Sequence, residues 1–136
     1  MTEERSNYEI RAESLRAGKA FEARRAQKLI DSFTAAALAA SLPTTRLRVR
    51  GYGGRGTASS NISGWYIRHD QSMGIGTDSR LYRLALPLSM LDRIRGVELQ
   101  PMDPPMVLGA GGRDGDSIDL VDALQRLLPE WEPPEV

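Results

Sequence analysis

The N-terminal third of the chain has the hydrophobic spacing of one long helix. In its second half, apolar side chains recur every three or four positions, as on the buried face of a helix: Leu29, Ile30, Phe33, Ala37 and Leu38. Ser6 and Glu9 have the capping-box spacing of a helix start, and Pro43 ends the pattern. We therefore predict a helix over Asn7–Ser41, with Gly18 as the place where it would break.

The first half of this helix is dense in charge and lacks a comparable apolar face. Its charged residues are Arg11, Glu13, Arg16, Lys19, Glu22, Arg24, Arg25 and Lys28. Tyr8 and Leu15 fit a heptad, but charged residues occupy the middle of that heptad pattern, which argues against an extended coiled coil. We predict that residues 1–25 form a projecting helical arm, either solvated or in contact with a partner. The partner contacts would be Tyr8, Leu15 and Phe21.

The middle of the chain alternates apolar and polar residues, which is typical of strands. Turns at residues 70–71 and 78–79 divide it, and a Gly/Ser-rich stretch at Gly53–Asn61 reads as a loop. The predicted strands form an antiparallel meander of three to four strands: Thr45–Tyr52, Ser63–His69, Met73–Thr77 and Leu81–Leu86.

Alternation along these strands assigns their side chains to two faces. One face is apolar and is expected to pack on the second half of the helix: Leu47, Val49, Trp65, Ile67, Met73, Ile75, Tyr82, Leu84 and Leu86. The other face is polar and basic: Arg46, Arg48, Arg50, Tyr52, Tyr66, Arg68 and Arg83.

Two shorter helices are predicted in the C-terminal half. Ser89–Arg95 is closed by Gly96, and Ser117–Leu128 is stopped by a proline. Short strands are predicted at Val97–Gln100 and Met106–Leu108. The pattern as a whole predicts an α+β fold in a single domain over residues 1–136, with residues 130–136 as an acidic, proline-rich tail.

The formal net charge of zero is the sum of two opposite halves. Residues 1–70 carry 12 Lys or Arg and 7 Asp or Glu, which gives +5, whereas residues 71–136 carry 6 and 11, which gives −5. Inside the basic half, three arginines at alternate positions form a row on one strand face: Arg46, Arg48 and Arg50. Such a row meets either an external anion or the acidic half of the same chain.

The arginine face has two interpretations. Guanidinium groups bind phosphate bidentately, and tyrosines stack on bases, which favours a nucleic acid or another polyanion. The residues of that site would be Arg46, Arg48, Arg50, Tyr52, Arg55, Tyr66 and Arg68. Alternatively, the face is solvated or docks the acidic half. Arginine outnumbers lysine 16 to 2, as expected of a high-GC bacterium or its phage, so an arginine here is weaker evidence for phosphate binding.

A second candidate site lies before the last predicted helix. Asp114, Asp116 and Asp119 fall within six residues, and carboxylates at that density can hold a divalent cation for an enzyme. Helix capping explains them more simply, with Asp116 or Ser117 as the N-cap and Asp119 in the first turn. We therefore predict no metal and no cofactor.

The remaining composition narrows the function classes. There are no cysteines, so disulfides and thiol chemistry are excluded. The N-terminus lacks the apolar region of a signal peptide, and the apolar run Phe33–Leu42 is too short for a membrane span, so we expect a cytoplasmic protein. The favoured function is a non-enzymatic macromolecular interaction protein whose partner is another protein or a second copy. Nucleic-acid binding is the alternative and a metal-dependent enzyme the second; we expect no membrane partner and infer no small-molecule substrate.

Overall fold

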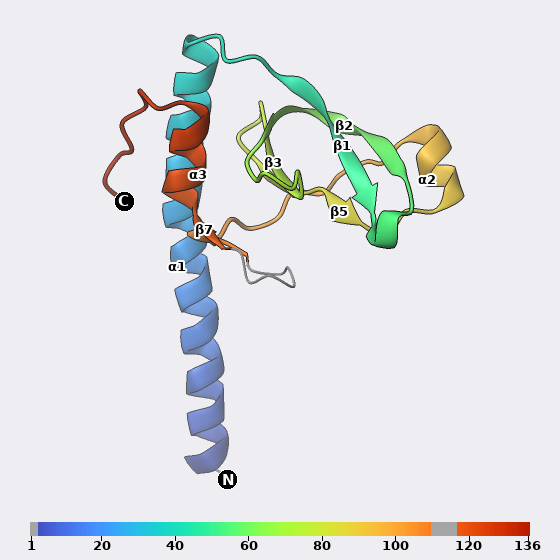
Figure 1. Ribbon diagram of the computed structural model, residues 1–136. Coiled ribbons are helices and arrows are strands. Elements are labelled where there is room, and N and C mark those ends of the chain that lie inside the picture. Colours follow the sequence, from blue (N-terminus) through green and yellow to red (C-terminus); the bar gives the residue numbers. More distant parts are fainter. Residues whose placement is uncertain (1–2, 110–116) are drawn as a thin grey trace.

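The computed structural model describes residues 3–109 and 117–136, which form an α+β fold beside one long helix (Figure 1). The predicted fold class is confirmed. In chain order the elements are α1 (Glu3–Ala39), β1 (Thr45–Gly51), the 3₁₀ turn η1 (Tyr52–Gly54), β2 (Thr57–Tyr66), β3 (Met73–Gly76), β4 (Leu81–Arg83), β5 (Ala85–Leu86), α2 (Met90–Arg95), β6 (Val107–Leu108), β7 (Ile118–Asp119) and α3 (Leu120–Leu127).

Helix α1 is continuous, and its N-terminal half extends well beyond the rest of the protein (Figure 1). It runs through Gly18 without a break and begins at Glu3 rather than after Ser6, so both of those predictions are wrong. A single exposed glycine costs a helix only about 1 kcal/mol, which its neighbours outweigh. The first fully buried side chain of the helix is Ala26.

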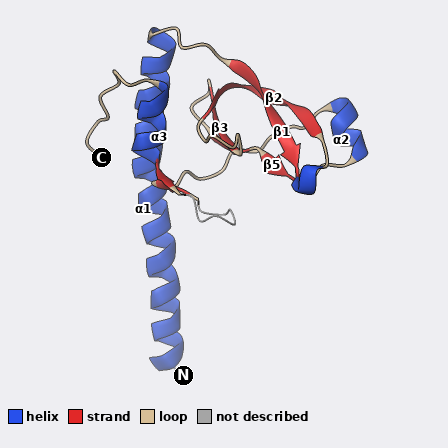
Figure 2. Cartoon of the chain, in the orientation of Figure 1, coloured by secondary structure: helices blue, strands red, loops and turns tan. Residues whose placement is uncertain are grey.

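The five-stranded sheet closes on itself. Its strand order is β4-β3-β2-β1-β5, with antiparallel pairs except for the parallel pair β1–β5. The two edge strands are consecutive pieces of one stretch joined at Leu84. The Leu84 amide donates to the Ser72 carbonyl on one side, at 2.8 Å, and its carbonyl accepts from the Arg50 amide on the other, at 2.8 Å. The antiparallel meander is therefore confirmed, but the sheet is rolled, with an inner and an outer surface (Figure 2).

Rolling divides the apolar residues into two clusters. The inner cluster comprises Leu47, Val49, Tyr82, Leu84 and Leu99. The outer cluster lies between the sheet and α1 and includes Ala26, Leu29, Ile30, Phe33, Trp65, Ile67, Met73, Ile75 and Leu81. The prediction that one apolar face packs on the helix is thus wrong, because only part of those residues face α1.

Aromatic contacts hold the outer cluster together. The Phe33 ring lies edge-on to Trp65, with centroids 5.6 Å apart, and edge-on to Trp131, at 5.7 Å. The Trp131 indole nitrogen also donates to the Ser32 hydroxyl, at 3.1 Å. The sheet and the segment after α3 are therefore both fixed to the same turn of α1.

A bulge interrupts the pairing of β1 with β2. Arg46 pairs with Ser63 and Arg48 with Ser59, so two residues of β1 span four residues of β2. The Ser60 hydroxyl donates to the Leu47 carbonyl, at 2.7 Å, and so satisfies a backbone group that the bulge leaves without a strand partner.

The Gly/Ser-rich stretch after the bulge is mostly strand, so its prediction as a loop is wrong. β2 begins at Thr57, and Ala58 and Ser60 are buried. Small residues with loop-like composition are used here to fill the narrow inside of the rolled sheet.

The C-terminal half follows the predictions in part. Helix α2 and its end at Gly96 are confirmed, and the structure adds a capping box between Ser89 and Asp92. Helix α3 begins later than predicted, because Ile118–Asp119 forms β7 and pairs with β6. None of the helices in the described ranges is long and apolar enough to cross a membrane.

We expect Gly64→Ala to destabilise the protein by about 3 kcal/mol, because an added Cβ would overlap the Ile75 carbonyl oxygen on β3. Urea unfolding measures the change. The control is Gly18→Ala, where a Cβ meets nothing, which should not destabilise the protein and should stabilise it by up to about 1 kcal/mol. Equal stability of the two variants would contradict the close approach of β2 to β3.

Candidate nucleic-acid interface

The arginine row lies on the outer surface of β1. Leu47 and Val49 point into the inner cluster, and the three arginines that alternate with them are exposed: Arg46, Arg48 and Arg50. The strand geometry therefore presents three guanidinium groups on one side of a rigid, paired strand.

Within the described part of the chain, the partners of each arginine of the row are uncharged. Arg46 donates to the Ser60 carbonyl, at 3.0 Å. Arg48 donates to the hydroxyls of Ser59 and Thr57, at 3.0 and 2.8 Å. Arg50 donates to the Gln71 side-chain oxygen, at 3.2 Å.

No carboxylate of the described residues pairs with the row. Among residues 3–109 and 117–136, Asp70 forms an ion pair with Arg68, which lies outside the row. The acidic half of the chain, as far as it is described, therefore leaves the charge of the row uncompensated. Neutral hydrogen bonds orient the guanidinium groups without neutralising them.

The cross-strand hydroxyls hold Arg48 in place. Arg48 pairs with Ser59 across the sheet, and Arg50 pairs with Thr57, so these side chains stand on the same outer surface. Two hydroxyls, from Ser59 and Thr57, fix the Arg48 guanidinium. Because the side chain is already ordered, less entropy is lost when an anion binds to it.

The turn after β1 continues the row. Gly51 donates its amide to the Gly56 carbonyl, at 2.9 Å, which closes the turn, and Tyr52 within it is exposed. Arg55 lies in the same turn and is also exposed.

Arg93 of α2 is a further cation at this turn, and sequence reasoning missed it. A Cβ built on Gly56 would lie 2.8 Å from the Arg93 Cδ and 3.2 Å from a guanidinium nitrogen. The glycine content of this segment indicates a tight turn, and Gly56 has the positive φ of such a turn. No local sequence signal indicates which distant side chain lies against the turn.

Tyr66 does not lie on the arginine face, so its assignment there is wrong. It is half-buried against the inner cluster, and its hydroxyl accepts a hydrogen bond from the Arg48 amide, at 2.9 Å. The register explains the difference: Arg46 pairs with Ser63, so the outer surface of β2 continues to Trp65 and the next residue points inward.

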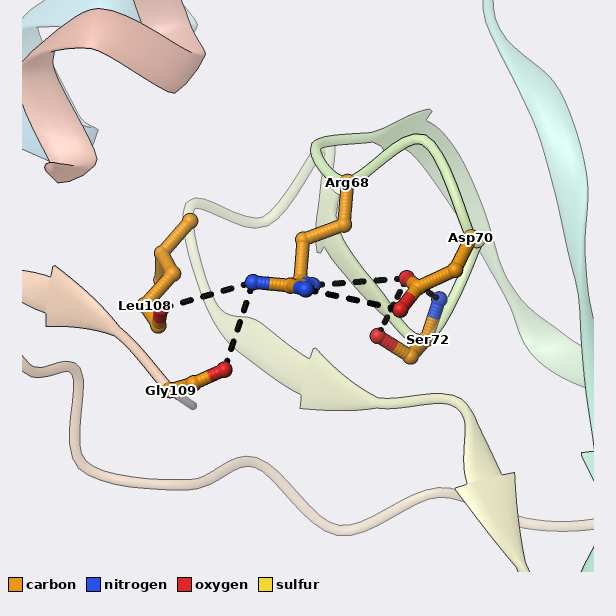
Figure 3. A network of polar contacts seen from close by, with 5 residues as sticks. All are labelled: Arg68, Asp70, Ser72, Leu108 and Gly109. Carbon is orange, nitrogen blue, oxygen red and sulfur yellow. Dashed lines mark hydrogen bonds and ion pairs between the residues drawn. The ribbon is translucent and has the colours of Figure 1, made fainter. Parts of the chain in front are cut away.

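Arg68 is also separate from the row. Its guanidinium donates to Asp70, at 3.3 Å, and to the carbonyls of Leu108 and Gly109, at 3.4 and 3.3 Å (Figure 3). It therefore ties the turn before β3 to β6. Asp70 also accepts from the amide and the hydroxyl of Ser72, at 3.0 and 2.6 Å.

The Asp70 carboxyl titrates below its usual range. Partial burial raises its pKa, but the hydrogen bonds from Ser72 and the hydrogen bond and positive charge of Arg68 outweigh burial and lower the pKa overall. Asp70 therefore stays ionised at neutral pH.

The aspartate cluster is only partly within the described structure. Asp114 and Asp116 lie outside the described residues. Asp119 is the residue before α3, and its side chain makes no capping hydrogen bond, so the predicted cap at Ser117 and the first-turn place for Asp119 are wrong. In the described ranges, no three His, Asp or Glu side chains gather as metal ligands.

We expect Asp70→Asn to destabilise the protein at pH 7 by no more than about 1 kcal/mol, because the ion pair is partly solvent-screened. The folded-state pKa is lowered, so this stabilisation is present above the unfolded-state pKa and is lost as the pH falls through the folded-state value. Urea unfolding of both proteins should therefore show a difference at pH 7 that shrinks toward pH 2. A constant difference would contradict the interpretation.

Comparisons of the chain with protein-family models, with curated proteins and with solved structures found no match. The function of the arginine row must therefore be inferred from its own geometry and charge.

Proposed function

We propose that this protein is a non-enzymatic interaction protein that binds a nucleic acid through the backbone phosphates. The contact residues are Arg46, Arg48 and Arg50 on β1, extended at the turn by Arg55 and Arg93. One observation carries the proposal: the three guanidinium groups of the row are exposed, aligned and, among the described residues, paired with neutral groups.

The energetics of such a row favour a polyanion over a single small anion. Arginines at alternate strand positions are about 6.6 Å apart, so each can contact a different phosphate along one strand. Each contact releases a condensed counterion, which makes the affinity additive along the row and strongly dependent on salt. Arg48, held by two hydroxyls, supplies the best-ordered contact.

We expect the variant Arg46→Ala/Arg48→Ala/Arg50→Ala to lose most of its affinity for oligonucleotides. The slope of log affinity against log salt should also fall by about 2, since three phosphate contacts are removed. Fluorescence anisotropy with a labelled oligonucleotide at several salt concentrations measures both quantities.

The matched control removes the same charge from the arm. Arg11, Arg16 and Arg24 are exposed on α1, and their triple alanine variant should bind like the unaltered protein. Equal loss of affinity in the two triple variants would mean that net charge alone, rather than the row, is responsible, and unchanged binding in the row variant would refute the proposal.

A second candidate function is self-association through the arm of α1. Tyr8, Leu15 and Phe21 are 74%, 68% and 58% exposed. Tyr8 precedes the buried Ala26 by 18 residues and Leu15 precedes the buried Phe33 by 18, which is five helical turns. The face that α1 buries in the outer cluster therefore continues along the exposed arm, where a second copy of the arm can cover it. The arm carries charges of both signs, so two arms meet without strong net repulsion.

Light scattering tests this second function. We expect a mass of at least two chains at high protein concentration, and a single-chain mass for Tyr8→Asp/Leu15→Asp, because charge on this line prevents apolar contact. Circular dichroism should show that this variant stays folded, since neither side chain belongs to a buried cluster. A single-chain mass for the unaltered protein at every concentration would exclude self-association.

A further inference from the structure

We infer that the nucleic acid is single-stranded and that one of its bases stacks on Tyr52. This inference rests on the proposed function of the arginine row, and it identifies the class of ligand. It combines the exposure of Tyr52, the shape of the hollow beside it and the charge on the wall of that hollow.

Tyr52 is an aromatic ring without a ring partner. It follows β1 directly, so it stands at the end of the arginine row, and it is 56% exposed. Among the described residues, aromatic contacts join Phe33 to two tryptophans and Phe21 to two arginines, and none involves Tyr52. An exposed ring beside a basic row is the arrangement with which single-strand binders stack bases.

Tyr52 borders a hollow large enough for a base. The hollow has a volume of about 520 Å³, and its lining includes Arg50, the turn, Asp70, Ser72 and Ala85. This volume falls in the roughly 300–1,000 Å³ range of small-molecule sites. A hollow of this volume has room for one base.

Glycines keep the space around Tyr52 open. Gly53 and Gly54 follow it with φ angles of 64° and 72°, and a Cβ at either would meet nothing within 4 Å. The turn therefore needs glycine for its backbone conformation. Neither glycine adds a side chain to the lining of the hollow that Tyr52 borders.

The charge on the hollow determines which part of a nucleotide enters. The Asp70 carboxylate lines the hollow and repels phosphate, while Arg50, which also lines it, belongs to the row. A nucleotide is therefore oriented with its base in the hollow and its phosphate on the row. In a duplex both faces of each base are covered by neighbouring pairs, so Tyr52 could stack only on an unpaired base.

The test compares Tyr52→Ala with Tyr52→Phe. The probes are labelled DNA and RNA strands of about 12 nucleotides, single-stranded or annealed to a complement, in the range of a single-strand site. Tyr52→Ala should weaken single-strand binding by about 5- to 150-fold, the loss expected for one stacked base. Tyr52→Phe keeps the ring and should bind within about twofold of the unaltered protein. Leu38→Ala is the control, because it removes an exposed hydrophobic side chain from α1, outside the row and its turn.

The outcomes separate this inference from the proposed function. Loss of binding in the row variant but not in Tyr52→Ala would overturn stacking and leave phosphate binding standing. Tighter binding of the duplex than of the single strand would overturn the assignment to single strands. Binding that survives removal of all three row arginines would overturn the proposed function itself.

Discussion

The fold depends on the closure of the sheet at Leu84. This residue belongs to both edges at once, because its amide pairs with β3 through Ser72 and its carbonyl pairs with β1 through Arg50. Closure bonds both ends of the β4–β5 stretch into the sheet and creates an inside that is filled by its own apolar cluster. It also determines that the arginines of β1 face outward, since Leu47 and Val49 fill the interior. The candidate interface is thus a direct result of rolling the sheet.

The structure shows where the opposite charges of the two halves of the chain lie. The basic half gathers its exposed arginines on β1, and the described acidic residues lie elsewhere. Asp70 lines the same hollow as Arg50, and Arg68 and Ser72 already engage it. A row held by hydroxyls and amides keeps its full charge while losing much of its side-chain freedom, which is the combination that favours anion binding.

Much of the fold could be predicted from the sequence, but only the features that depend on residues close together in the chain. Helical spacing identified α1, and the closing Gly96 identified the end of α2, because caps and periodicity act within a few residues. The rolled sheet was missed. The alternation of apolar and polar residues assigns Leu84 to one face of a strand, but it does not indicate that the two edges of the sheet meet at this residue. In the candidate site, alternation placed the row correctly. It failed for Tyr66, whose face depends on the register between two strands, and for Arg93, which reaches the turn from a distant helix.

Consecutive residues of β2 join the two halves of the molecule. Trp65 packs on Phe33 of α1, and the next side chain, Tyr66, turns inward and holds the backbone of Arg48 through its hydroxyl. One peptide bond thus separates the helix contact from the support of the arginine row. Displacement of Trp65 from α1 would therefore also move the tyrosine that holds the backbone of Arg48.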